Sequence, residues 1–343
     1  MRLQASETLQ PCELLKDMDH QFTHHFENKA YTHIPGISVL DAKSVDPTTV
    51  FIGSHISVVK PLMMRDQVPQ NGGYLIQDCF RCHNLALMKQ EPRPVQHGGY
   101  FRCHGLIAPY CKLIELVNDT INFVTTSLGD ISKLRVQVAE DDVDLIQALN
   151  KTLIKPAQII KFENTNGMRH RYGDDQLSGR DIHLHLQHGS QIIDFGIIAA
   201  IDKCNQPKFV EVALVPGKIV QSRLELSHFF DIFSPPKLAI SEQSLRRIIE
   251  DAFISIGFLY SQGLRTGKSG QPGALKRCLN GFLVLTQRAG IQQEQAFNIL
   301  FLYCQQHFSM DDAGINAIKT DFGKLKTVQR SSSSNTAPAV SIA

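Results

Sequence analysis

The chain has 343 residues, enough for about two domains of ordinary size. Hydrophobic residues make up 43% of it and charged residues 20%, as in ordinary globular proteins. The net charge of +2 excludes a globally basic nucleic-acid-binding protein, so any such surface must be local. The sequence also lacks an export signal and an apolar run long enough to span a bilayer. We therefore expect a cytoplasmic protein without membrane contact, whose eight cysteines are reduced thiols.

Helix and strand patterns alternate in the first two thirds of the chain. Leu14, Met18 and Phe22 recur at helical spacing, which predicts an amphipathic helix over 12–29. Later patterns predict strands at 74–83 and 98–107, a helix over 110–126, a strand at 134–138, a helix over 141–154, strands at 157–162, 181–187, 191–201 and 208–214, and a helix over 218–232. This order predicts an α+β domain built on an antiparallel sheet flanked by helices.

Two prolines at 235–236 mark the expected domain boundary. Beyond them the apolar spacing predicts only helices, at 241–259, 272–289, 292–307 and 311–326. We therefore expect an α+β domain over 1–235, an all-α domain over 236–328 and a disordered serine-rich tail over 329–343.

The tetrapeptide Phe-Arg-Cys-His occurs at 80–83 and again at 101–104, in two apolar-rich runs joined by a polar connection over 89–96. This pattern predicts two antiparallel strands with a long loop between them. It places Arg81 near the centre of a sheet, beside aromatic side chains. A guanidinium buried in such a place grips a phosphate or a carboxylate through paired hydrogen bonds. Arg81 is therefore the first candidate for a functional residue.

The thiols and imidazoles of the same two strands suggest zinc as an alternative. Its ligands would come from Cys79, Cys82, His83, Cys103 and His104. Successive residues of a strand point to opposite faces, so Cys82 and His83 cannot both converge on one ion. Buried thiols beside an arginine are the preferred interpretation, with no protein-bound metal.

Polar and apolar residues alternate in the strand expected at 181–187. The polar members are Asp181, His183 and His185. The alternation predicts one polar face and one core face. We interpret the polar face as the wall of a ligand pocket, with a metal site and a solvated surface as alternatives.

Several short motifs follow one another in a distinctive order. They are a helix with Phe22, His25 and Phe26, then Asp46-Pro-Thr-Thr-Val-Phe-Ile, the Gln77–Asn84 run, the segment 134–142, Gln158-Ile-Ile-Lys leading to Gly173-Asp174 and Gly179, and the segments 258–263 and 270–277. This order resembles the class II catalytic domain of alanyl-tRNA synthetases and the helical tRNA-contacting domain that follows it. The resemblance covers residues 12–292 and lies in order and spacing more than in identity.

The resemblance implies a class II synthetase-like antiparallel sheet and a set of ATP-binding residues. Arg81 takes the place of the arginine that bridges the ATP α-phosphate and the amino-acid carboxylate, and Arg223, at an expected helix start, lies near the γ-phosphate arginine. Phe101 lies where the family stacks adenine, and Arg102 stands where the family has a glutamate. Asp181 lies, with His183, on a strand that borders the nucleotide. The implied cofactors are ATP and Mg²⁺, with zinc as the alternative described above.

The implied function is that of a ligase of protein biosynthesis, which adenylates a small amino acid and transfers it to tRNA or another acceptor. The residues implied in tRNA binding are Arg265, Lys268, Lys276 and Arg277. Segment 215–223 departs from the family, because it lacks the aspartate that recognises the substrate amine; Glu211 or Asp181 could replace it. The alternative is a catalytically impaired paralogue that binds tRNA, a nucleotide or a protein.

Overall fold

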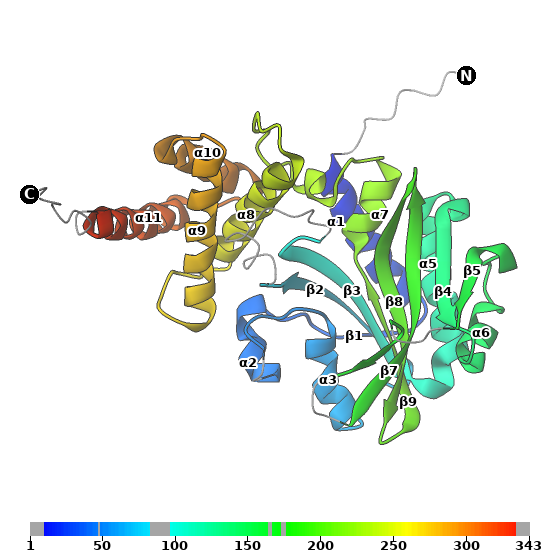
Figure 1. The fold of residues 1–343 in the computed structure, drawn as a ribbon. Coiled ribbons are helices and arrows are strands. Elements are labelled where there is room, and N and C mark those ends of the chain that lie inside the picture. The colour runs from blue at the N-terminus through cyan, green and yellow to red at the C-terminus, as the bar shows by residue number, and fades with distance from the viewer. Residues whose placement is uncertain (1–9, 47–48, 83–96, 164–166, 173–175, 334–343) are drawn as a thin grey trace, which may run out of the picture. The chain divides into compact units, whose positions relative to one another are not determined.

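The computed structural model describes residues 10–46, 49–82, 97–163, 167–172 and 176–333 (Figure 1). The chain forms two compact units. The α+β unit comprises the residues up to Phe80 together with Phe101–Ile232. The helical unit comprises Arg81–Tyr100 together with the residues from Phe233 onward. The predicted polar connection over 89–96 and the last ten residues of the predicted tail lie outside the described residues.

A single sheet forms the centre of the α+β unit, and it has nine strands among the described residues. The strands are β1 (Thr32–His33), β2 (Gly73–Phe80), β3 (Tyr100–Pro109), β4 (Leu134–Ala139), β5 (Ile159–Phe162), β6 (Arg169–Arg171), β7 (Leu177–His188), β8 (Gln191–Lys203) and β9 (Gln206–Leu214). Their spatial order is β1-β2-β3-β9-β8-β7-β4-β5, with β6 paired to β7.

The pairing in the middle of the sheet is antiparallel. The antiparallel pairs are β3 with β9, β9 with β8, β8 with β7, and β7 with β4. The pairs β1 with β2 and β4 with β5 are parallel. The predicted antiparallel sheet is therefore confirmed for its centre and is mixed at its two ends. Long apolar strands stabilise this centre, because side chains such as Ile198, Val212 and Leu184 are fully buried.

Helices pack on the sheet of the α+β unit (Figure 1). Their bounds are α1 (Pro11–Glu27), α2 (Ala42–Val45), α3 (Ile56–Met64), α5 (Leu113–Leu128), α6 (Val143–Leu149) and α7 (Pro216–Arg223). Short 3-10 turns are η1 (Val39–Asp41), η2 (Tyr110–Lys112), η3 (Ile131–Lys133), η4 (Pro156–Gln158) and η5 (Phe229–Phe233). The helix predicted over 12–29 is confirmed as α1, whose Phe22 and Phe26 pack against Phe123 of α5.

Some boundaries differ from the sequence prediction for local reasons. The helix predicted over 218–232 is the shorter α7, which starts at Pro216 and ends where Glu225 takes a positive φ of 51°. Sequence patterns do not predict α3, because Pro61 lies inside it. They do not predict β6 either, since it lies in a segment whose composition indicates a loop.

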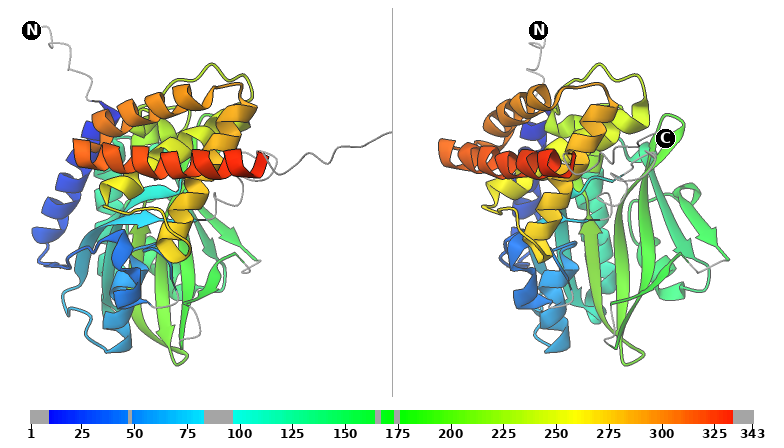
Figure 2. Two further views of the ribbon diagram at one scale, coloured as in Figure 1. Left: turned by 90° about the vertical axis from the view of Figure 1, so that its left-hand side faces the viewer. Right: turned by 60° about the vertical axis from the view of Figure 1, so that its left-hand side comes forward.

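The helical unit contains four α-helices among its described residues, α8 (Gln243–Ser261), α9 (Gly270–Arg288), α10 (Gln293–Phe308) and α11 (Asp312–Ser333). Their starts lie within two residues of the predicted ones, and α11 continues beyond its predicted end. Figure 2 shows the four helices gathered together. Aromatic contacts stabilise the packing of these helices: Phe282 of α9 contacts both Phe253 of α8 and Phe297 of α10. Within the described parts of the chain, no helix has the length and apolar character that a membrane span requires.

Candidate functional site

β2 and β3 are neighbours in the sheet as predicted; β2 ends earlier than expected, at Phe80, whereas β3 has the predicted length. Nε of Arg102 on β3 lies 2.9 Å from Oδ1 of Asp78 on β2. One further pair continues this register, since the N–H of Arg81 donates to the carbonyl of Gly99 at 2.8 Å. The prediction that Arg81 is buried at the sheet centre is wrong. β2 ends at Phe80, so the side chain of Arg81 lies just beyond the strand and is exposed.

Arg102 and His104 lie on the face of the sheet that α1 covers, which we call the helix-covered face. Arg102 forms ion pairs with Asp19 of α1 and with Asp78. Nε2 of His104 lies 2.7 Å from Oδ1 of Asp19, and its ring stacks on Phe22 at 4.2 Å between centroids. Burial alone would raise the pKa of Asp19, but the hydrogen bond from His104 and the charge of Arg102 lower it. The guanidinium of Arg102 therefore forms ion pairs with two carboxylates. The cofactor-binding role of Arg102 stays a prediction.

The other face, which we call the polar face, carries Phe101 and a buried Cys103–His55–Glu211 cluster. Sγ of Cys103 lies 3.6 Å from Nδ1 of His55, and Nε2 of His55 lies 3.1 Å from Oε2 of Glu211. The hydroxyl of Tyr172 donates to the other oxygen of Glu211 at 2.6 Å. The exposed fractions of Cys103, His55 and Glu211 are 1%, 0% and 2%. Gly105 is needed beside this cluster, because a Cβ there would lie 2.4 Å from Cδ2 of His55.

Charge separation stabilises the Cys103–His55–Glu211 cluster. Burial would lower the pKa of His55, but Cys103 and Glu211 raise it to about 10. A hydrogen bond with Cys79, followed by the effect of His55, holds the pKa of the Cys103 thiol well below 9.0 in spite of burial. Both shifts favour the charged forms of the two groups, a thiolate and an imidazolium. Sequence patterns miss His55, because only the tertiary fold brings it to β3.

The predicted zinc ligands do not come together in the described structure. Cys79 and Cys103 share the polar face, whereas His104 lies on the helix-covered face with Asp19. His83 lies outside the described residues. Within the part of the chain that the structure describes, no group of three His, Cys, Asp or Glu residues has an arrangement that could hold a metal ion.

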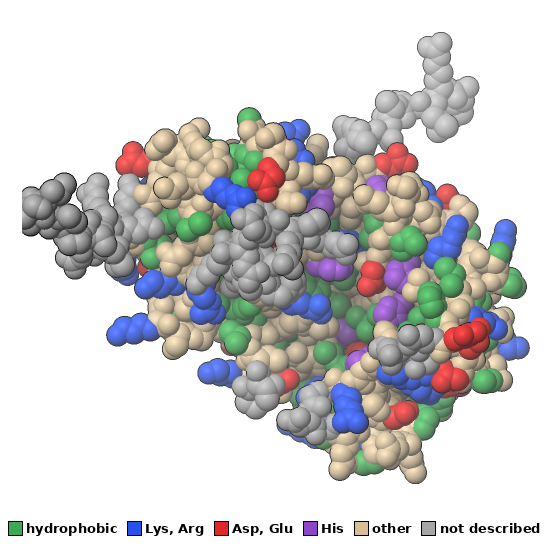
Figure 3. All heavy atoms as spheres, viewed as in Figure 1, with side chains coloured by type: hydrophobic (Ala, Val, Ile, Leu, Met, Phe, Trp, Pro, Cys, Tyr) green, Lys and Arg blue, Asp and Glu red, His purple; other side chains and the backbone are tan. Residues whose placement is uncertain are grey.

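The alternation predicted in β7 is confirmed. Ile182, Leu184 and Leu186 are fully buried. The register of the strands aligns Asp181 with Glu211 and His183 with Gly105 across the sheet, so the side chains of Asp181 and His183 lie on the polar face. Nδ1 of His170 lies 2.8 Å from Oδ2 of Asp181. Figure 3 shows histidine side chains, with an acidic group among them, gathered around β8 on this side of the sheet.

The helix after β9 carries two basic residues, Lys218 and Arg223. Arg223 lies in the last turn of α7 and is exposed, so the prediction that it stands at a helix start is wrong. The helix begins earlier because Pro216 suits its first position. Lys218, in the first turn, is 6% exposed and its Nζ lies 4.9 Å from the ring centroid of Phe229. Burial lowers the pKa of Lys218 to about 8, although Asp194 opposes this shift.

The basic residues implied in tRNA binding are on the surface of the helical unit. Arg265, Lys268, Lys276 and Arg277 are all exposed. The first two lie in the loop before α9 and the last two lie in α9 itself, which begins at Gly270.

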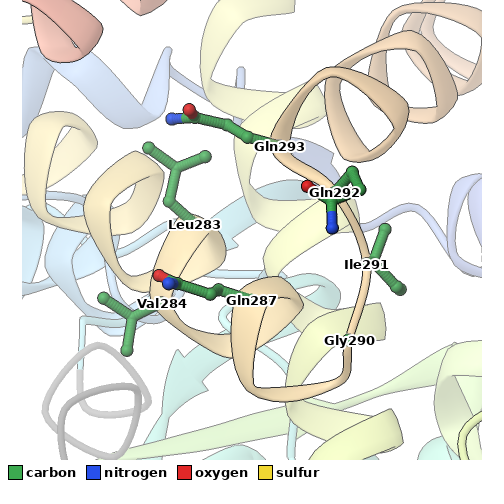
Figure 4. Close-up of a pocket in the computed structure, with 7 residues that line it drawn as sticks. All are labelled: Leu283, Val284, Gln287, Gly290, Ile291, Gln292 and Gln293. Atoms are coloured by element: carbon green, nitrogen blue, oxygen red, sulfur yellow. The ribbon is translucent and has the colours of Figure 1, made fainter.

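A hollow of about 340 Å³ lies elsewhere in this unit, at the turn between α9 and α10 (Figure 4). Its lining consists of Leu283, Val284, Gln287, Gly290, Ile291, Gln292 and Gln293, which provide amide and apolar groups and no charge. It has none of the titratable or nucleophilic side chains that catalysis needs.

Neither a protein-family model nor a curated protein matches this sequence. Solved structures of class II aminoacyl-tRNA synthetases are similar to it in fold. Apo histidyl-tRNA synthetase from S. aureus is 12% identical, with a TM-score of 0.44 over 71% of this chain and 73% of that one.

Asparaginyl-tRNA synthetase from Entamoeba histolytica, in complex with asparaginyl-adenylate, is 8% identical, with a TM-score of 0.41 over 65% of each chain. The RNA binding domain of threonyl-tRNA synthetase from Cryptosporidium parvum is 9% identical, with a TM-score of 0.42 over 65% of this chain and 69% of that one. TM-scores below 0.5 do not identify an activity, and these specificities do not point to alanine.

Proposed function

We propose that this chain is a class II synthetase-like ligase that uses ATP to adenylate a small amino acid. The observation that carries the proposal is the polar face of the sheet. There Phe101 shares an antiparallel sheet with Asp181, His183 and Glu211, on the side opposite α1. An aromatic ring suits an adenine base, and the polar groups suit an amino acid. Alanine is the amino acid that the sequence resemblance implies.

In the proposed reaction the amino-acid carboxylate attacks the α-phosphorus of ATP. A carboxylate oxygen–phosphorus bond forms, the bond from phosphorus to the bridging oxygen breaks, and pyrophosphate leaves with that oxygen. Arg81 would stabilise the charge shared between the carboxylate and the α-phosphate, because its planar fork donates two parallel hydrogen bonds. Arg223 would bind the γ-phosphate. Both arginines are exposed.

Mg²⁺ would accompany the ATP. Of the carboxylates on the polar face, that of Asp181 is of the kind that Mg²⁺ accepts, whereas Glu211 is 2% exposed and already contacts His55 and Tyr172. The histidines beside Asp181 are poor ligands for Mg²⁺. Mg²⁺ commonly takes one or two carboxylates and completes its shell with phosphate oxygens and water. The described residues fit that limited role better than a dedicated metal cage. The ion would neutralise phosphate charge.

Amino-acid-dependent ATP–pyrophosphate exchange tests the adenylation directly. We expect purified protein to incorporate labelled pyrophosphate into ATP when a small amino acid is present, because adenylation is reversible. A panel of glycine, alanine, serine, proline and threonine would identify the amino acid. If none of the twenty standard amino acids raised exchange above the rate without amino acid, the adenylation proposal would be wrong.

We propose tRNA as the acceptor, bound through the exposed basic residues of the helical unit. These residues are Arg265, Lys268, Lys276 and Arg277. Removing all four charges by substitution with alanine is expected to lower the slope of log Kd against log salt by about 3, because each phosphate contact releases counterions. Filter binding with unfractionated tRNA at several salt concentrations measures this slope. Removal of Lys16 and Arg65, exposed cations of the α+β unit, should leave the slope unchanged; equal slopes for all proteins would contradict the assignment.

A further inference from the structure

Two buried thiols lie side by side on the polar face of β2 and β3. The N–H of Arg81 donates to the carbonyl of Gly99, and this register puts Cys79 opposite Phe101. Cys103 lies two residues further along the same face, so the two cysteines are diagonal neighbours. Their side chains share a hydrogen bond. The exposed fractions of Cys79 and Cys103 are 0% and 1%, so the pair is enclosed by the fold.

His55 distinguishes the two thiols. Its Nδ1 lies 3.6 Å from Sγ of Cys103, and its Nε2 lies 3.1 Å from a carboxylate oxygen of Glu211. An imidazole that a carboxylate orients beside a thiol favours the nucleophilic thiolate and can give a proton to a leaving group. Cys103 is therefore the thiol suited to attack, and Cys79 is placed to react with whatever forms on it.

Burial selects the molecule that can react with this pair. A sulfur with an exposed fraction of 1% is open only to a molecule near the size of water, because thiol exchange depends on access to the sulfur. Oxidised glutathione and protein disulfides are much larger than that. Hydrogen peroxide is small enough, and its O–O bond accepts the electron pair of a thiolate. The cluster therefore suits a small hydroperoxide.

We propose that Cys103 is a site of oxidation by hydrogen peroxide and forms a reversible disulfide with Cys79. The Cys103 thiolate attacks one peroxide oxygen. A sulfur–oxygen bond forms, the O–O bond breaks, and the departing hydroxide leaves as water with a proton from His55. The sulfur of Cys79 then attacks the resulting sulfenic acid. A disulfide forms, the sulfur–oxygen bond breaks, and a second water leaves with the thiol proton.

The overall reaction oxidises two thiols and reduces one peroxide to two waters. Closure of the bridge requires a local movement, because the Cβ atoms of diagonal partners are up to about 7–8 Å apart and a disulfide needs about 4 Å. Cys79 is the last residue but one of β2, so a shift of the strand end is sufficient. The inference goes beyond the proposed adenylation, since it depends only on the buried cluster.

Peptide mapping of the oxidised protein tests the proposal. The full chain is treated with a small molar excess of hydrogen peroxide, remaining thiols are alkylated in denaturant, and the tryptic digest is analysed by mass spectrometry without reduction. Trypsin cuts after Arg81, which separates Cys79 from Cys82. We expect a cross-linked species that is lighter by two hydrogen atoms than its reduced peptides, with fragmentation placing the bridge between Cys79 and Cys103. Dithiothreitol should separate the two peptides.

Cys304 is the matched control within the same protein. It is fully buried, as Cys79 is, but burial raises its pKa to about 12. Cys103 should be oxidised at least about 100-fold faster than Cys304, because the two differ in thiolate character and not in exposure. Equal rates for Cys103 and Cys304 would overturn the proposal, since they would show oxidation through general unfolding.

Two serine variants separate the steps. Cys79→Ser removes the second thiol, so the sulfenic acid on Cys103 should persist and be captured by dimedone. Cys103→Ser should leave Cys79 as slow to react as Cys304. Circular dichroism shows whether each variant is folded, and Cys79→Ser with the wild type decides the question if Cys103→Ser is not. Oxidation of Cys103 in the wild type without a bond to Cys79 would overturn the proposed disulfide.

Discussion

Arg81→Ala is expected to lower kcat/KM for amino-acid-dependent ATP–pyrophosphate exchange by about a thousandfold. The guanidinium would hold both the attacking carboxylate and the α-phosphate, so its loss removes charge stabilisation and alignment together. Arg81→Lys keeps the charge but loses the fork, and we expect it to recover no more than about a tenth of the wild-type rate.

Arg65→Ala is the matched control for that experiment, because Arg65 is also an exposed arginine directly after an element of the α+β unit, here α3. Its exchange rate should equal that of the wild type. Exchange at the wild-type rate in the Arg81→Ala protein would show that this arginine takes no part in adenylation. The exposure of Arg81 favours a clean test, since its removal leaves no buried cavity.

His55→Ala is expected to destabilise the fold by about 3–5 kcal/mol, the cost of leaving buried charges without their partner. His55 is fully buried between Cys103 and Glu211, so the variant places a cavity and an unpaired carboxylate under the polar face. Urea unfolding followed by circular dichroism gives the change in the free energy of unfolding. His20→Ala, an exposed histidine of α1, should stay within about 0.5 kcal/mol of the wild type. A similar small change in the His55→Ala protein would contradict the charged cluster.

The thiolate–imidazolium pair also predicts a pH profile. Where the folded protein holds a thiolate and an imidazolium and the unfolded chain holds a thiol and a neutral imidazole, each state carries one proton on the pair, so its contribution is level. Below pH 6.5 the unfolded chain binds a second proton, and stability falls by up to about 1.4 kcal/mol per pH unit. Above 9.0 the unfolded chain loses its proton while His55 keeps one up to a pKa of about 10, so stability falls again.

The same urea titrations, repeated from pH 5 to pH 10, measure that profile. His55→Ala should reduce the acid slope, because it removes the imidazolium that favours the Cys103 thiolate in the folded state. An acid slope of the same size in the variant and the wild type would show that the pair is neutral in the folded protein.

Local patterns predicted the elements whose side chains alternate or repeat cleanly. The helical spacing in α1 and the period of two in β7 depend on short-range geometry, and both were expected within a few residues. The buried cluster could not be predicted in this way. Cys103, His55 and Glu211 lie far apart in the sequence, and only the strand order of the sheet brings them together.

Arg81 shows the limit of reading a strand from apolar residues alone. The predicted strand extends to residue 83, but the N–H of Phe80 donates to the carbonyl of Ile52 and β2 ends at Phe80. A prediction from composition cannot tell where a chain leaves a sheet, because the neighbouring segment decides it. The same holds for Arg102, whose carboxylate partner Asp19 comes from α1.

The central claim is that the polar face of the sheet binds the nucleotide, and a crystal structure of the protein with ATP and Mg²⁺ tests it most directly. We expect the adenine ring to stack on Phe101, on the side of the sheet that carries Cys103 and Asp181. A nucleotide bound on the side that carries Arg102 and His104, or on the helical unit alone, would contradict the claim.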